Sequence, residues 1–163
     1  MIFVALLLSF VAVQRLGELV LARRNTRRLL ARGAYEVGAG HYPLIVALHA
    51  AWLLGLCWFG RDAEVQPLWV GVYAVLQGFR AWILASLRER WTTRIIILPG
   101  EPLVRRGPYR LMPHPNYLLV AAEIAVLPLA LGLETYALVF SVLNAAVLTI
   151  RIPAEGRALA ELR

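Results

Sequence analysis

Lysine is absent from this 163-residue sequence, and cysteine, histidine and acidic residues are scarce. The single cysteine, Cys57, excludes a disulfide framework within the chain. The histidines at positions 41, 49 and 114 show no i,i+4 spacing, so no zinc site is expected. The sequence also lacks a Walker-type phosphate loop, a G-x-G-x-x-G turn and a serine in a nucleophile elbow. These absences argue against nucleotidase and hydrolase functions.

Apolar residues dominate what is present. The hydrophobic fraction is 60% and the mean hydropathy is +0.66, values typical of an integral membrane protein. We therefore predict one all-α membrane domain over residues 1–163. The opening run MIFVALLLSF has no basic residue ahead of it, so we expect a retained first span rather than a cleaved signal peptide. About five transmembrane helices are expected, at residues 2–21, 43–60, 67–87, 118–132 and 134–150. The last two are short and should form a hairpin that turns at Gly132 and Glu134.

Arginine supplies all the basic residues behind the net charge of +7. Fourteen arginines follow spans one, three and five, and only Arg61 lies between spans two and three. The positive-inside rule then places the N-terminus outside and the C-terminus in the cytosol. This placement accounts for the basic charge without nucleic acid as a partner.

The segment 98–117, LPGEPLVRRGPYRLMPHPNY, is the longest run that is neither a span nor a plain connector. It holds five prolines and two glycines, which favour a shaped loop over a helix. Arginines, tyrosines and His114 are interleaved with them. We predict a loop at the membrane surface that cradles a polar cofactor. A proline-rich connector is the alternative.

Polar residues inside the spans fall at a similar depth, roughly 8–10 Å below the cytosolic edge at about 1.5 Å per residue, with Glu18 shallower. Ionisable groups at that depth are costly unless they are paired or face a cavity. We expect a polar pocket open to the cytosol and reachable from lipid. Purely structural roles remain open for each residue: an ion-pair clamp, an interhelical hydrogen bond or a buried histidine. The residues concerned are Arg15, Glu18, His49, Arg80, Glu123 and Asn144.

Two boundaries complete the expected layout. A short basic interfacial helix should follow span one and end near Gly33. Pro153 should stop or kink span five, leaving a short amphipathic helix over residues 154–163.

Two stretches of the sequence carry a resemblance to a known family. The run GPYRLMPHPNY at 107–117, the hydrophobic hairpin after it, and RIPAEGRAL at 151–159 together resemble the isoprenylcysteine carboxyl methyltransferase family. In that family, an R-H-P-x-Y element, a helical hairpin and an R-x-x-x-E-E-x-x-L element build an S-adenosylmethionine site. Pro113 stands here in place of the arginine, and Gly156 in place of the second glutamate. Arg110 or Arg106 would supply the cation, and Glu155 the acidic role alone.

The stretches RGAYEVGAGHYP, RWTTRIIILPGEPL and HPNYL are also similar to a bacterial branch found beside type III polyketide synthases. This resemblance implies a bacterial inner-membrane enzyme that methylates an alkylpyrone or alkylresorcinol hydroxyl, in a pathway shared with such a synthase. Its partners would be a lipid-like substrate and membrane lipids.

The resemblance and the chemistry of S-adenosylmethionine together suggest how the cofactor is held. Backbone N–H groups of the loop and an arginine suit its carboxylate, tyrosines suit adenine or the sulfonium, and Glu155 suits the ribose hydroxyls or the amine. The expected cofactor-binding residues are Leu103, Val104, Gly107, Tyr109, Arg110, His114, Pro115, Tyr117, Glu155 and Leu159.

Methyl transfer is mainly a matter of positioning the acceptor oxygen near the methyl group. We expect Arg151 and Glu123 to act in catalysis, with Arg151 orienting a carboxylate acceptor or with Glu123 or His49 as a base for a phenolic one. The expected acceptor-binding residues are His49, Arg80 and Asn144. Other possibilities are a prenylcysteine-like carboxyl or phospholipid methyltransferase, a membrane reductase that uses a nicotinamide cofactor, and a non-enzymatic membrane scaffold.

Overall fold

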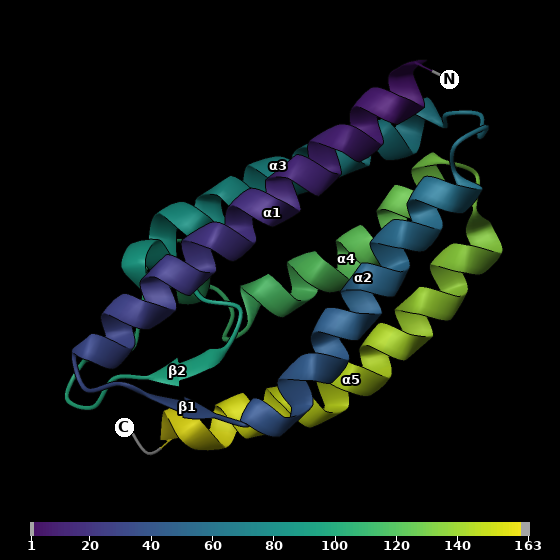
Figure 1. Ribbon diagram of the computed structural model, residues 1–163. Coiled ribbons are helices and arrows are strands. Elements are labelled where there is room, and N and C mark those ends of the chain that lie inside the picture. The colour runs from purple at the N-terminus through teal and green to yellow at the C-terminus, as the bar shows by residue number, and fades with distance from the viewer. Residues whose placement is uncertain (1, 161–163) are drawn as a thin grey trace.

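The computed structural model describes residues 2–160, which form five α-helices and a two-stranded antiparallel ribbon (Figure 1). The elements in chain order are α1 (Ile2–Ala31), β1 (Tyr35–Val37), η1 (Ala39–His41), α2 (Tyr42–Phe59), α3 (Pro67–Leu87), η2 (Arg88–Arg90), β2 (Ile95–Ile97), η3 (Gly107–Arg110), α4 (Pro115–Ala130) and α5 (Glu134–Ala160). The predicted all-α membrane fold with a C-terminal helical hairpin is confirmed.

Four helical segments are long and apolar enough to cross a membrane: those that comprise α1, α2, α3 and α5. The fifth, α4, is shorter. Its 16 residues span roughly 24 Å at about 1.5 Å per residue, less than the roughly 30 Å of a hydrocarbon core. Of the five helices in the described residues, four thus have the length of a full span, and α4 packs between α3 and α5 as an interior helix (Figure 1).

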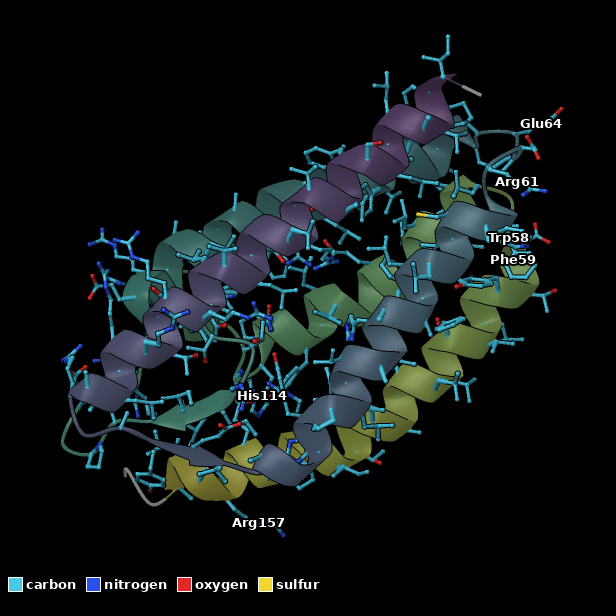
Figure 2. All side chains as sticks on the ribbon, viewed as in Figure 1. Trp58, Phe59, Arg61, Glu64, His114 and Arg157 are labelled. Carbon is cyan, nitrogen blue, oxygen red and sulfur yellow. The ribbon has the colours of Figure 1, made fainter. Side chains whose placement is uncertain are left out.

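The N-terminal end of α1, the α2–α3 connection and the α4–α5 turn lie at one end of the bundle (Figure 1). The ribbon, the C-terminal end of α5 and the long loop before α4 lie at the other. Trp58, Phe59, Arg61 and Glu64 mark the first end, far from His114 (Figure 2). Most of the described arginines lie on the last turns of α1, in η2, in the loops around β2 and η3, and on the last turns of α5. These segments lie at the second end, which we call the arginine-rich end (Figure 1).

At its C-terminal end α1 is longer than expected. A span over residues 2–21 and a separate interfacial helix after it were predicted. Instead, one helix continues through the arginines at positions 23–28 to Ala31. Gly33, two residues beyond the end of α1, has φ of +91°, and the Gly33 and Ala34 N–H groups donate back to the carbonyls of Leu30 and Leu29. Asn25, which is buried, donates from Nδ2 to the carbonyls of Arg88 and Trp91 at 3.2 and 2.8 Å. This polar anchor holds the extension against the start of the next loop, so the helix does not break at the membrane edge.

Pro153 was predicted to stop or kink the last helix, and it does not stop it. Helix α5 continues through Pro153 to Ala160, and only positions 161–163 of the predicted amphipathic helix lie outside the described residues. Pro153 removes one backbone donor, a limited loss in a long helix. Beyond it, Ala158 packs with Ile95 and Ile97 of β2 in a small apolar cluster. Burial of that face explains why the helix persists.

The ribbon was not predicted. Tyr35, Glu36 and Val37 pair with Ile97, Ile96 and Ile95 in antiparallel register. The pairing joins the segment before α2 to the segment after α3 and provides the surface on which the end of α5 rests.

Candidate functional site

A cavity of about 810 Å³ lies at the arginine-rich end, lined by both polar and apolar residues. We call it the polar cavity, because several arginines, His114 and Glu155 line it. Its walls come from β2, the long loop, the start of α4 and the last turns of α5. The sequence-predicted residues that line it are Leu103, Val104, Tyr109, Arg110, His114, Tyr117, Arg151, Glu155 and Leu159. The loop therefore contributes to a built cavity and is not only a connector.

His114 and Glu155 meet across this cavity. His114 Nδ1 lies 3.1 Å from Glu155 Oε2, and because a carboxylate only accepts hydrogen bonds, Nδ1 carries the proton. The His114 ring also stacks on Tyr117, with centroids 5.4 Å apart. His114 lies on the inner side of the bundle (Figure 2). Arg157, which is on the last turns of α5 as Glu155 is, points outward (Figure 2). The two sequence elements that carry the family resemblance are thus in direct contact.

The loop is held at both ends while its middle amides stay available. Glu101 pairs with Arg32 of α1 and with Arg90. Further along, Arg106 Nε donates to the Ser86 carbonyl at 2.7 Å. Within the described residues, the N–H groups of Leu103 and Val104 have no protein acceptor. A fixed loop with free amide donors is suited to an anionic group.

Tyr109 closes one side of the cavity. Burial, and secondarily the negative charge of Glu155, raises the pKa of the Tyr109 hydroxyl above its ordinary value. The hydroxyl therefore stays protonated at any physiological pH, and the ring offers a neutral aromatic face.

Some residues that line the polar cavity were not predicted from the sequence. Chief among them are Arg94 and the β2 residues Ile95–Ile97. Arg94 pairs with Glu36 at 2.8 Å and lies over the Tyr42 ring at 4.2 Å. The run of three β-branched isoleucines was the available signal for a strand.

A second, smaller cavity of about 240 Å³ lies deeper in the bundle, with mostly apolar walls from α1, α2, α4 and α5. His49, Arg80 and Asn144, the expected acceptor-binding residues, all line it, together with Arg15 and Glu18. The polar residues that the sequence places at similar depth therefore do gather around one space, except Glu123.

Glu123 does not line this cavity and is fully buried. Its carboxylate accepts hydrogen bonds from Arg15 Nη2 (2.7 Å), Arg80 Nε (3.0 Å) and Gln77 Nε2 (2.9 Å), and Arg80 Nη2 also pairs with it. Glu18 accepts from Arg80 Nη1 at 2.7–2.8 Å. We call Arg15, Glu18, Arg80 and Glu123 the charge cluster. Two arginines and two glutamates balance within it, which is what makes their burial tolerable.

The two cavities share five wall residues: Trp91, Thr92, Asn116, Tyr117 and Arg151. Arg151 is 8% exposed and donates from Nε to the Tyr117 hydroxyl at 3.0 Å and from Nη2 to the Thr93 carbonyl at 2.7 Å. A reactant in the polar cavity and another in the apolar one would meet at this shared wall.

Two residues expected to bind a cofactor do not line the polar cavity. Gly107 has φ of +57° and packs against Ser86 and Trp82 of α3, which leaves no room for a side chain. Pro115 occupies the first turn of α4, where its missing N–H costs nothing. Both shape the backbone that presents Tyr109 and His114.

Comparison with known proteins gives this arrangement a family. Residues 69–161 match the Isoprenylcysteine carboxyl methyltransferase (ICMT) family. The matched region covers nearly all of α3, the loop, α4 and all of α5. It includes almost the whole lining of the polar cavity and about half of the lining of the apolar one. The chain belongs to this family, and the membership indicates a membrane methyltransferase.

Two relatives extend the similarity to almost the whole chain. The uncharacterized protein YpbQ of Bacillus subtilis is 40% identical over 161 residues, covering 96% of both chains. An uncharacterized protein of Haemophilus influenzae is 25% identical over 171 residues, covering 99% of this chain and 98% of its own. No solved structure matches the chain.

Proposed function

We propose that this protein transfers a methyl group from S-adenosylmethionine to a hydroxyl of a long-chain alkylpyrone or alkylresorcinol, at the cytosolic face of a bacterial inner membrane. The observation that carries the proposal is the pair of cavities that meet at Arg151 and Tyr117, one polar and open to the arginine-rich end, the other apolar. A water-soluble methyl donor and a lipid acceptor need such a pair.

The residues of the polar cavity fit S-adenosylmethionine. The amides of Leu103 and Val104 would receive its carboxylate, and Glu155 its ribose hydroxyls or amine. The faces of Tyr109 and Tyr117 would lie against adenine or the sulfonium. When bound, the cofactor supplies an electrophilic methyl group.

The apolar cavity would hold the acceptor. Its polar lining, His49, Asn144, Arg80 and Arg151, faces a space whose other walls are apolar. The acceptor head would rest at the shared wall, with its alkyl chain in the bundle or lipid. Such fixed placement of the oxygen near the methyl group supplies most of what methyl transfer requires. Glu123 would act as a positioning residue through Arg15 and Arg80.

The acceptor assignment and the link to a type III polyketide synthase pathway rest on the sequence similarity to that bacterial branch. A prenylcysteine-like carboxylate is a second candidate, because Arg151 at the shared wall is suited to a carboxylate. None of the described residues at this wall carries a carboxylate that would pair with a phospholipid amine.

Membranes that contain the protein test the proposal directly. We expect labelled methyl transfer from S-adenosylmethionine to alkylpyrones, and slower transfer to short-chain analogues. Equal rates at all chain lengths would argue against a lipid acceptor, and transfer only to farnesylcysteine would favour the carboxylate candidate. Arg157→Gln serves as a control for Arg151→Gln, because Arg157 lines neither cavity and points outward (Figure 2).

Cofactor titration separates the remaining alternatives. Purified protein should bind S-adenosylhomocysteine and not NADPH. Binding of NADPH alone would indicate a reductase, and binding of neither would indicate a membrane scaffold.

A further inference from the structure

His49 has an unusual position among the residues of the apolar cavity. It lies on α2, and its Nδ1 is 2.8 Å from the carbonyl oxygen of Ile45, one turn earlier on the same helix. A carbonyl only accepts hydrogen bonds, so Nδ1 must carry the proton in this contact. Nε2 is then an unprotonated acceptor, and it has no hydrogen-bond partner among the described residues. The helix fixes the tautomer that leaves a basic nitrogen free.

The other charged groups that face the cavity are already engaged. From α1, Glu18 accepts from Arg15 and Arg80, and the guanidinium groups of Arg15 and Arg80 are bound to Glu18 and Glu123. From α5, Arg151 is bound to Tyr117 and Thr93. Asn144 offers an amide, which is not a base. Of the described residues that line the cavity, His49 is the one with a free basic atom.

We propose that His49 is the general base of the reaction, accepting through Nε2 the proton of a weakly acidic hydroxyl on an acceptor held in the apolar cavity. This inference rests on the proposed function and defines its acceptor more closely. As His49 Nε2 takes the hydroxyl proton, the oxygen lone pair bonds to the methyl carbon. The bond from that carbon to sulfur breaks, and its electrons stay on sulfur. One positive charge thus passes from the sulfonium to the imidazolium, so the net charge of the enclosed site does not change.

A base at this position is informative about the substrate. A carboxylate acceptor is ionised at neutral pH and needs no base. A phenolic or enolic hydroxyl is mostly protonated at that pH and gains from one. A free imidazole nitrogen in a mostly apolar cavity therefore favours a hydroxyl acceptor over a carboxylate.

The first test needs no cofactor. A long-chain alkyl nitrophenol, whose phenolate absorbs visible light, is titrated with pH in the presence of the purified protein. Wild type should form the bound phenolate at a pH about 1–3 units below that of His49→Gln, because the imidazolium is a nearby opposite charge. His41→Gln is the matched control, since His41 lines neither cavity and should behave as wild type. Equal midpoints for wild type and His49→Gln would overturn the proposal.

The second test uses turnover. His49→Gln should lose about 10²–10⁴-fold in kcat on an alkylphenol of ordinary acidity, the usual contribution of general base catalysis. The loss should shrink strongly on the nitrophenol, which ionises without help, while affinity for S-adenosylhomocysteine stays unchanged. An equal loss on both acceptors would show that His49 has only a structural role.

A measurement on wild type covers the case in which His49→Gln does not fold. Nitrogen NMR of labelled histidine should show His49 pass from neutral imidazole to imidazolium when the nitrophenol binds, and an unchanged neutral signal would refute the proposal. Failure of the proposed function has a different signature. If no hydroxyl lipid is methylated although His49 becomes charged on binding, the cavity binds phenols but the enzyme acts on another group.

Discussion

At the scale of single residues, Glu123 has the most demanding environment. It is fully buried and is the shared acceptor for Arg15, Arg80 and Gln77. Glu123→Ala would leave two guanidinium groups with one carboxylate between them. Removing one partner of a buried pair typically costs about 3–5 kcal/mol, so we expect a large fall in the thermal unfolding midpoint in detergent.

Glu89 provides the control for this prediction. It pairs with Arg28 at 3.4 Å, and its side chain is 67% exposed. Solvent screens such pairs, so Glu89→Ala should leave the unfolding midpoint nearly unchanged. A similar small effect in Glu123→Ala would mean that the charge cluster does not stabilise the bundle.

The contact between His114 and Glu155 leads to a binding prediction. His114→Ala and Glu155→Ala should each weaken S-adenosylhomocysteine binding. Both side chains are partly exposed, and a bound ligand would bury them, so the expected loss is about 1–3 kcal/mol, the usual effect of leaving a buried polar group without its partner. Calorimetric titration of folded protein measures this. Wild-type affinity in both variants would show that the cofactor binds elsewhere.

At the scale of elements, the long loop depends on glycine in two places that differ in their surroundings. Gly107 and Gly100 both have positive φ, at +57° and +78°. A Cβ at Gly107 would overlap the Ser86 hydroxyl, whereas nothing lies within 4 Å of a Cβ at Gly100. Alanine is strained at a positive φ, so both variants should lose stability through the backbone. Only Gly107→Ala must also displace side chains of α3.

We therefore expect Gly107→Ala to lower both the unfolding midpoint and the affinity for S-adenosylhomocysteine more than Gly100→Ala does. Thermal melts and titration in parallel give the comparison. If Gly100→Ala is the more damaging of the two, the packing of the loop on α3 does not control the cavity.

Helices were the elements best predicted from the sequence, and the ribbon the worst. Length and apolar composition indicate a helix directly, and the glycine at 132 marks the turn of the C-terminal hairpin. The strands have three residues each and pair with residues about sixty positions away in the chain. Because the partner is so distant, no local sequence pattern predicts which segment pairs with Ile95–Ile97. The continuation of α5 beyond Pro153 could not be predicted for a related reason, because the last turns of α5 pack on that ribbon.

For the candidate site, too, the sequence predicts some properties and not others. Helical rise gives the depth of Arg80, Glu123 and His49 from sequence, but not the rotation of each helix about its axis. That rotation decides that Glu123 points into the charge cluster while His49 faces the cavity. Sequence could therefore supply the members of the polar layer and not their separate roles.

At the scale of the whole molecule, the arginine distribution predicts orientation. The ribbon, the polar cavity and the C-terminal end of α5 share the arginine-rich end, and Arg61 lies at the other (Figures 1 and 2). A reporter fused after Arg163 should be cytosolic, and one inserted near Asp62 should be external. The opposite labelling would remove the polar cavity from the cytosolic pool of S-adenosylmethionine.

The wall that Arg151 and Tyr117 form between the two cavities has a consequence for the order of events in turnover. If each reactant reaches the wall from its own phase, neither covers the entrance of the other, and either can bind first. The methyl ether has lost a hydrogen-bond donor and should partition into the bilayer, while the spent cofactor leaves into water. Initial-rate kinetics should then show a random-order ternary complex. In it, S-adenosylhomocysteine competes with S-adenosylmethionine but is noncompetitive toward the lipid.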